Sequence, residues 1–156
     1  PGQGAASQDP LDGPATVGLS RVELARRDLR PFRTALRRAP AVTVSSASYT
    51  AYDPVTPAAL VPGIVRRLLR RVLRFRGVAM TDDVSALATA TGESRGRAAV
   101  LALKAGIDLV YVPEPAQRSR AYDAVLRAAR SGRLPRARVR DAVARVLELK
   151  RRAGVR

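Results

Sequence analysis

Two adjacent aspartates, Asp82 and Asp83, carry the clearest chemical signal in the sequence. They follow Thr81 and close the short apolar run 77–80, which is typical of a buried strand. The end of a buried strand is rigid, so it can hold a carboxylate still against a substrate, and barrel enzymes keep catalytic groups there. The same residues have a second interpretation, in which they cap the next helix or fix a loop.

Few other side chains could carry out chemistry. The chain has no cysteine and no histidine, so it lacks the commonest general acid/base and the thiolate and imidazole ligands of metals. We therefore expect no metal and no cofactor. Ser45 and Ser46 end a predicted strand, but no histidine is present to activate either hydroxyl as a nucleophile. Asp108, close after Gly106, is expected to bind backbone groups or a neighbouring arginine in preference to a substrate.

The formal net charge of +16 comes almost entirely from arginine, since Lys104 and Lys150 are the only lysines. The arginines spread over the polar faces of several predicted helices, and no nucleic-acid-binding motif accompanies them. We expect weak, salt-sensitive binding to polyanions but no specific recognition of nucleic acid. No run approaches the roughly 18 apolar residues of a membrane span. The compartment, bacterial cytoplasm or cell envelope, and the oligomeric state stay open, and any export signal would lie upstream of Pro1.

Helices and strands alternate through the first half of the chain. Residues 20–23 form a capping-box pattern that opens a helix, and Pro31 predicts a kink or restart within it. Residues 41–46 are short and β-branched, as in a strand, and residues 54–62 contain several turn signals and are expected to form a loop. An arginine-faced helix should then run to near Gly77, with one apolar stripe: Ile64, Leu68, Leu69 and Val72.

The second half repeats this order. A helix over 98–105 should stop at Gly106, and a strand over 107–112 should follow. Helices are expected over 121–130 and 136–152, the last with an inward stripe of Val139, Ala142, Val143, Val146 and Leu149. The alternation predicts an α/β fold with a parallel sheet.

Two architectures fit this alternation, an open doubly wound sheet and part of a (β/α)8 barrel. No glycine-rich phosphate loop favours the first. A complete barrel needs on the order of 200–250 residues, more than the 156 present. About three strand–helix units and a leading loop would make up its C-terminal half.

Several ordered motifs resemble the barrel domain of family-3 glycoside hydrolases, on the β-N-acetylhexosaminidase side of that family. The matching segments, in family order, are Pro1-Gly2-Gln3-Gly4, Asp28-Leu29-Arg30-Pro31-Phe32, Ser45 to Tyr49 with Asp53, Leu69 with Phe75-Arg76-Gly77-Val78, Thr81-Asp82-Asp83, and Ala102-Leu103-Lys104-Ala105-Gly106-Ile107-Asp108-Leu109. The resemblance extends over the whole chain and implies that residues 1–156 are the C-terminal half of the barrel domain, with its upstream half before Pro1.

The resemblance implies a retaining glycosidase acting on a carbohydrate substrate, such as cell-wall glycans with β-linked N-acetylglucosamine. In that reaction a carboxylate attacks the anomeric carbon, and a second group donates and then accepts a proton. Asp82 matches the family's nucleophile, and Asp83 would orient it, contact substrate or cap the next segment. Ser46 and Tyr49 fall where the family has an Ala-His-x-x-Tyr motif, and the rings of Tyr49 and Tyr52 either line a sugar subsite or pack at its rim.

The proton donor departs from the family pattern. The resemblance places a loop histidine at the position of Leu11, and leucine cannot transfer a proton. Asp12 is the nearest titratable substitute, although an aspartate on an exposed loop is a poor proton donor near neutral pH. A second interpretation is therefore a catalytically inactive relative that binds glycan or a protein partner.

Overall fold

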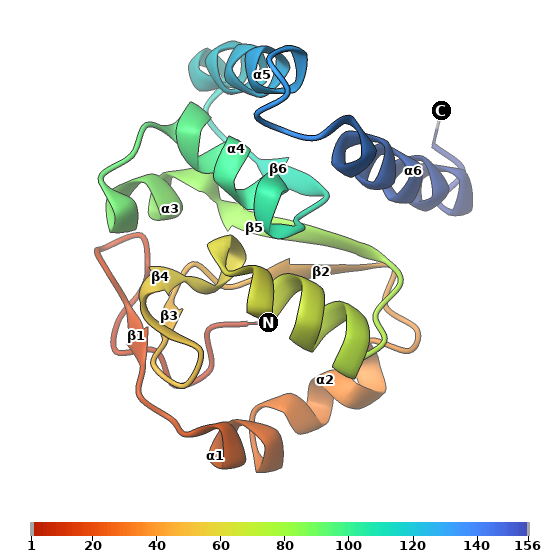
Figure 1. The fold of residues 1–156 in the computed structure, drawn as a ribbon. Coiled ribbons are helices and arrows are strands. Elements are labelled where there is room, and N and C mark those ends of the chain that lie inside the picture. Colours follow the sequence, from red (N-terminus) through yellow and green to blue (C-terminus); the bar gives the residue numbers. More distant parts are fainter. Residues whose placement is uncertain (1, 156) are drawn as a thin grey trace.

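The computed structural model describes residues 2–155, and its centre is a parallel sheet in the order β2-β5-β6. The strands are β2 (Ala41–Val44), β5 (Val78–Asp83) and β6 (Leu109–Tyr111). Thr43 pairs with Met80, and Met80 pairs with Leu109, so these three side chains form a row across one face. Figure 1 shows helices between the successive strands, the α/β arrangement that the alternation predicted.

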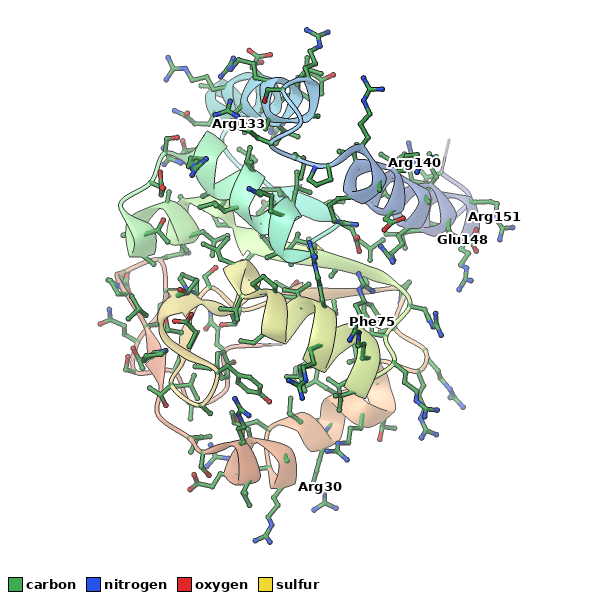
Figure 2. The ribbon with its side chains drawn as sticks, viewed as in Figure 1. Arg30, Phe75, Arg133, Arg140, Glu148 and Arg151 are labelled. Atoms are coloured by element: carbon green, nitrogen blue, oxygen red, sulfur yellow. The ribbon has the colours of Figure 1, made fainter. Side chains whose placement is uncertain are left out.

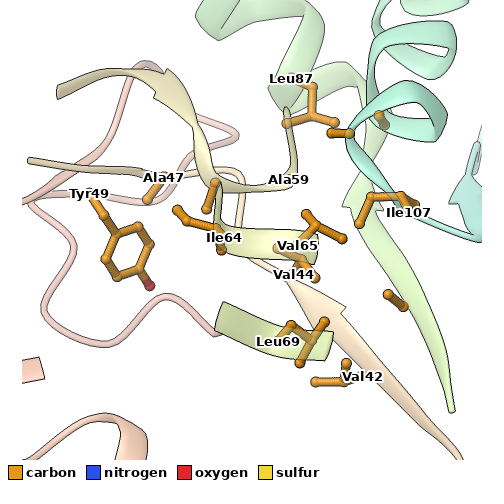
Figure 3. Packing of buried hydrophobic residues seen from close by; sticks show 14 of the residues in the cluster. Val42, Val44, Ala47, Tyr49, Ala59, Ile64, Val65, Leu69, Leu87 and Ile107 are labelled. Carbon is orange, nitrogen blue, oxygen red and sulfur yellow. The ribbon is translucent and has the colours of Figure 1, made fainter. Parts of the chain in front are cut away.

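The main core lies between one face of this sheet and its covering helices. Val42 and Val44 of β2 are buried and point toward Val65 and Leu69 (Figure 3). Leu87 and Ile107 belong to the same cluster. Because small and β-branched residues dominate it, the helices can lie close to the strands.

The helix before β5 has π-helical hydrogen bonding. This element, η2, is Gly63–Val72, and the Leu73 N–H donates to the Leu68 carbonyl five residues back. Ile64, Leu68 and Leu69 are buried as expected, but Val72 is 60% exposed and the helix ends there, before Gly77. The expected stripe assumed α-helical spacing, whereas the wider π turn moves Val72 out of the buried face.

Residues 54–62 are more ordered than their turn signals suggested. They include most of β4 (Asp53–Pro57) and the short 3-10 helix η1 (Ala58–Leu60). β4 pairs antiparallel with β3 (Ser48–Tyr49), which pairs parallel with β1 (Thr16–Val17) in a second sheet. The prediction of a loop was wrong because the two prolines stand at edge-strand positions, where a missing N–H is tolerated.

The first helical region is split in two. α1 (Arg21–Arg26) opens with the predicted capping box, in which Ser20 Oγ accepts from the Glu23 N–H and Glu23 Oε2 accepts from the Ser20 N–H. α2 (Leu29–Ala35) restarts two residues before Pro31, which therefore lies in the first turn, where proline is accommodated.

After β5 the chain forms α3 (Val84–Thr91), an unpredicted helix, and then α4 (Arg95–Ala105). Gly106 ends α4 with φ of 122°, a positive value that favours glycine. α5 (Pro115–Arg130) and α6 (Arg136–Arg152) complete the fold. Among the described residues, no helix is long and apolar enough to cross a membrane.

The stripe on α6 is not buried as expected. Ala142 is its only buried member, and Val143 is 48% exposed. Val139, Ala142, Val143 and Val146 instead line an open groove of about 740 Å³ between β6, α5 and α6. The stripe prediction was wrong because, within residues 2–155, that side of α6 borders the groove instead of packing against another element.

Candidate functional site

Asp82 lies at the carboxyl end of β5, where the pairing with β6 is irregular between Met80 and Asp83. Met80, two residues earlier in β5, is half-buried, and its partner in β2, Thr43, is exposed. Ala79 and Thr81, on either side of Met80 in the sequence, are fully buried. Met80 shares its face of the sheet with its register partners Thr43 and Leu109. The pairing of β5 with β6 becomes irregular after Met80, so the simple alternation does not extend to Asp82.

The Asp82 carboxylate is lightly engaged. Its Oδ1 accepts a hydrogen bond from the Asp83 N–H at 3.0 Å. No ion pair involves it within residues 2–155. It is half-buried, so it is both held by the strand end and open to solvent on one side.

Asp83, unlike Asp82, is engaged in capping a helix. Its Oδ1 accepts from the Ser85 N–H at 2.8 Å, and it is the N-cap residue of α3. This bond satisfies one of the free amides of the first helical turn. The strand end thus leaves one oxygen of Asp82 without a hydrogen-bond partner in residues 2–155 and uses Asp83 to begin a helix.

Ser45 and Ser46 follow β2 at the same edge of the sheet, because Val44 is paired with Thr81. The Ser45 hydroxyl accepts from the Ala47 N–H at 3.0 Å. Ser46 Oγ is buried and has no hydrogen-bond partner among the described residues. The parallel register therefore brings the two serines and the two aspartates to one end of the sheet.

Tyr49 lies elsewhere. Its ring lines a cavity of about 340 Å³ together with Gly2, Asp28 and Tyr52, and neither Asp82 nor Asp83 lines that cavity. The Tyr49 hydroxyl donates to the Gly2 carbonyl, and burial raises the pKa of this hydroxyl. Tyr52 is half-buried with the Arg21 guanidinium 5.1 Å from its ring centre.

The loop that carries Asp12 closes on itself. Asp9 Oδ1 accepts from the Leu11 N–H at 3.0 Å, and the Asp12 N–H donates to the Asp9 carbonyl at 3.0 Å. Leu11 and Asp12 are both exposed. Figure 1 shows this segment, in red, at the end of the molecule where β5 leads into α3.

Asp108 is fully engaged in structural contacts. Its buried carboxylate is paired with Arg70, with Arg138 at 2.6 Å and with Arg145 at 3.1 Å. It also accepts from the Ala79 N–H at 3.0 Å. This agrees with the expectation of an arginine partner and a backbone contact, although no local sequence pattern predicts that three arginines meet there.

The described part of the chain contains no group of three carboxylate, histidine or cysteine side chains that could hold a metal ion. What it does contain is a carboxylate at the carboxyl end of a parallel strand, with hydroxyl groups at the end of the adjacent strand. Parallel strands joined through helices, with polar groups at their carboxyl ends, are features of the class of α/β proteins that includes (β/α)8 barrels and doubly wound sheets.

Comparison with known proteins gives the family. Residues 1–149 match the Glycosyl hydrolase family 3 N terminal domain, and the chain belongs to this family. A β-hexosaminidase from Idiomarina loihiensis is 33% identical over 91 residues, which cover 58% of this chain and 27% of that protein. The family-3 resemblance drawn from the motifs is thereby confirmed.

Solved structures agree in fold. A family-3 β-N-acetylglucosaminidase from Paenibacillus sp. is 35% identical with a TM-score of 0.89, over 97% of this chain and 29% of that one. A β-N-acetylhexosaminidase from Beutenbergia cavernae is 32% identical with a TM-score of 0.85, over 96% of this chain and 44% of that one. The chain thus has the α/β fold of part of a family-3 (β/α)8 barrel and spans less than half the length of these relatives.

Proposed function

We propose that this chain provides the nucleophile end of a retaining glycosidase of the β-N-acetylhexosaminidase type, with Asp82 as the nucleophile. The observation that carries the proposal is the contrast between three carboxylates. Asp108 is paired with arginines and Asp83 caps α3, whereas Asp82 is half-buried, accepts one backbone hydrogen bond and takes part in no ion pair within residues 2–155. A nucleophile must be ionised, immobile and accessible, and Asp82 combines a rigid support with a free oxygen.

Asp82 would attack the anomeric carbon of a β-linked N-acetylhexosamine and form a glycosyl-enzyme intermediate that water then hydrolyses. The Asp83 cap would hold the strand end in place during attack. Ser46 Oγ is buried and without a partner in residues 2–155, so it would bind a sugar hydroxyl only if the end of β2 opened. Tyr49, in its separate cavity, is not assigned to this site.

Protonation of the leaving group is the weak step in this mechanism. Leu11 occupies the position where the family resemblance places a histidine, and it is 54% exposed. Asp12 would substitute only if a bound substrate covered its exposed turn. This favours a second candidate function, in which the chain binds glycan without hydrolysing it.

The test separates attack from protonation. The chain, alone and joined to the first half of a related barrel, is incubated with a fluorinated N-acetylglucosaminide bearing a dinitrophenolate leaving group, which departs without a proton. We expect a sugar adduct on the Asp82 peptide by mass spectrometry. The adduct should disappear in Asp82→Asn and persist in Asp83→Asn, because asparagine retains helix-capping ability.

Sugar binding without an adduct would instead support the glycan-binding candidate. An adduct on another residue would reject Asp82 as the nucleophile. Absence of both adduct and binding would reject both functions for this chain.

A further inference from the structure

A second concave site lies at the opposite end of the sheet from Asp82. It is a cavity of about 340 Å³ between the segments that precede β2 and β5, residues 36–40 and 74–77, and the C-terminal half of α6. We call it the basic pocket because its lining includes six arginines and one acidic residue: Arg37, Arg38, Arg74, Arg76, Arg145, Arg152 and Glu148. The glycosidase proposal uses none of these residues.

The positive charge of the basic pocket is not neutralised by the protein. Within the described chain, Arg37, Arg38, Arg74 and Arg76 take part in no ion pair. Glu148 is already held by two arginines, with its Oε1 2.8 Å from Arg151 Nη2 and 2.6 Å from Arg152 Nε. Figure 2 shows Glu148 and Arg151 together near the end of α6.

Residues 74–77, which lie along one side of the basic pocket, are held in place by hydrogen bonds from a buried ion-pair cluster. Arg70 pairs with buried Asp108 and also donates to the carbonyls of Phe75, at 3.2 Å, and Gly77, at 2.6 Å. These bonds tie residues 74–77 to the Asp108 cluster. Arg145, a lining residue, is anchored on the same carboxylate at 3.1 Å. The Arg145 side chain is therefore preorganised, and the backbone that carries Arg74 and Arg76 is held in place, while the side chains of these two arginines are exposed.

The cluster of arginines around Asp108 carries more positive than negative charge. Three guanidinium groups share the Asp108 carboxylate, which leaves an excess of two positive charges, and one of the three, Arg145, also lines the basic pocket. Burial lowers the pKa of Arg70, and the positive charges of Arg145 and Arg138 lower it further, against the attraction of Asp108. An anion in the basic pocket would relieve this repulsion.

Backbone conformation points to the same place. Arg74 has φ of 53°, the only positive φ at a non-glycine residue among the described residues. A left-handed arginine costs energy, and such outliers gather at functional sites because the surrounding structure has to enforce them. Here the enforced residue lines the basic pocket.

We propose that the basic pocket binds a small multivalent phosphate compound, one with two or more linked phosphate groups. Guanidinium groups form bidentate hydrogen bonds with phosphate oxygens, and arginine supplies all the cations here. Several arginines converge on one concavity, so a compact ligand with adjacent anionic groups matches the site better than a single phosphate. An extended nucleic acid would need a stripe of positive charge along the surface, and the pocket is a confined hollow.

The test uses isothermal titration calorimetry of the chain with pyrophosphate and tripolyphosphate at low ionic strength. The triple variant Arg37→Gln, Arg74→Asn, Arg76→Gln removes three pocket charges, with asparagine chosen because it tolerates a left-handed backbone. The matched control Arg30→Gln, Arg120→Gln, Arg127→Gln removes three exposed charges elsewhere. We expect the pocket variant to weaken binding about tenfold or more, as loss of charge-assisted hydrogen bonds implies, and the control to stay within about twofold.

A gain-of-binding variant complements this comparison. Glu148→Gln removes the acidic group of the basic pocket and frees Arg152, so it should tighten tripolyphosphate binding. If the triple variant fails to fold by circular dichroism, Glu148→Gln and the single variant Arg37→Gln decide the question. Tighter binding in the first and weaker binding in the second would support the proposal.

Three results would overturn it. Equal loss in the pocket and control variants would show that net charge alone drives binding. A single-stranded oligonucleotide that binds more tightly than tripolyphosphate, with no dependence on the pocket residues, would identify a diffuse polyanion surface instead. No heat of binding for either phosphate compound at low salt would exclude the site.

Discussion

The carboxylate of Asp108 holds together segments that are far apart in the sequence. Arg70 comes from η2, and Arg138 and Arg145 come from α6, and the side chain of Asp108 is fully inaccessible to solvent. Removing one partner from a buried charge cluster leaves the others without compensation. The contribution of Asp108 to folding should therefore exceed that of any surface ion pair.

Asp108→Asn is expected to lower the free energy of unfolding by about 3–5 kcal/mol, because three arginines lose their counter-charge. Urea unfolding followed by circular dichroism measures the change. Glu114→Gln is the matched control, since it breaks the exposed pair with Arg95 at 3.1 Å and should cost less than about 1 kcal/mol. Similar small losses in both variants would show that the arginines find other partners.

Tyr49 makes stability depend on pH at the alkaline end. Burial raises the pKa of its hydroxyl above the ordinary value of 10.0, so the folded state keeps the proton after the unfolded state has lost it. The resulting stability is complete below about pH 10 and is lost as the pH rises above it.

Tyr49→Phe removes the hydrogen bond to Gly2 and should cost about 1 kcal/mol near pH 8. The variant cannot ionise, so the difference from the parent chain should shrink above about pH 10. Urea titrations between pH 8 and 11 measure this difference. Tyr122→Phe, at a ring that is 67% exposed, is the control, and a difference that stays constant with pH would contradict the assignment.

At the scale of elements, Gly77 sets how closely the starts of β2 and β5 approach. A Cβ atom at this position would lie 2.3 Å from the Pro40 carbonyl oxygen, and the neighbouring Val78 N–H donates to that same oxygen at 3.0 Å. The Pro40 carbonyl is part of the backbone, so it cannot make room for a Cβ atom as a flexible side chain could. Glycine is required here for close approach of two strands.

Gly77→Ala should lower the free energy of unfolding by about 1–3 kcal/mol, as overpacking does, because β5 must shift relative to β2. Gly63→Ala is the control, since the nearest atom to its Cβ would be 3.8 Å away. Chemical denaturation of both variants measures the effect. An unchanged midpoint for Gly77→Ala would mean that the strand starts move apart at little cost.

The elements that could be predicted from the sequence are those with local signals. Residues 20–23 predict the start of α1, Gly106 predicts the end of α4, and the β-branched run at 41–46 predicts β2. α3 was missed because its Ala-, Ser- and Thr-rich sequence has no amphipathic period. Which residues of η2 face the core could not be predicted, because π-helical hydrogen bonds, between residues five apart, leave no distinct sequence pattern.

The candidate site was predictable only in part, because some of its features depend on contacts that have no local sequence signal. Asp82 and Asp83 follow from position at a strand end, but their division into a free carboxylate and a helix cap depends on the irregular end of β5 and on the Ser85 amide. The place of Tyr49 in a separate cavity depends on contacts with residues 2 and 28, which lie far away in sequence. Long-range packing of this kind has no local signature.

At the scale of the whole molecule, the sheet has two free edges among the described residues, beside β2 and beside β6. The groove along α6 adds exposed apolar surface, with Leu147 59% exposed and Tyr111 47% exposed. Free strand edges and apolar grooves promote association. We expect residues 1–156, as one partial barrel domain, to be marginally stable or to self-associate when produced alone.

Size-exclusion chromatography across a range of concentrations and thermal melts measure this expectation. Leu147→Glu should reduce association by placing a charge in the groove, whereas Val55→Glu, on the 79% exposed Val55 of β4, should leave it unchanged. A monomer at all concentrations that melts sharply above about 60 °C would contradict the prediction.

The loop before β1 has a consequence for how such a domain can change over time. Its internal bonds run from Asp9 to Leu11 and Asp12, from Gln8 to the Pro14 carbonyl, and from Ser7 to Thr16. A segment that closes on itself in this way behaves as a module, since substitutions at its exposed tip leave the sheet and its arginine-bound carboxylate untouched. We therefore expect that a proton-donating side chain introduced at the exposed Leu11 or Asp12 would leave the rest of the fold intact.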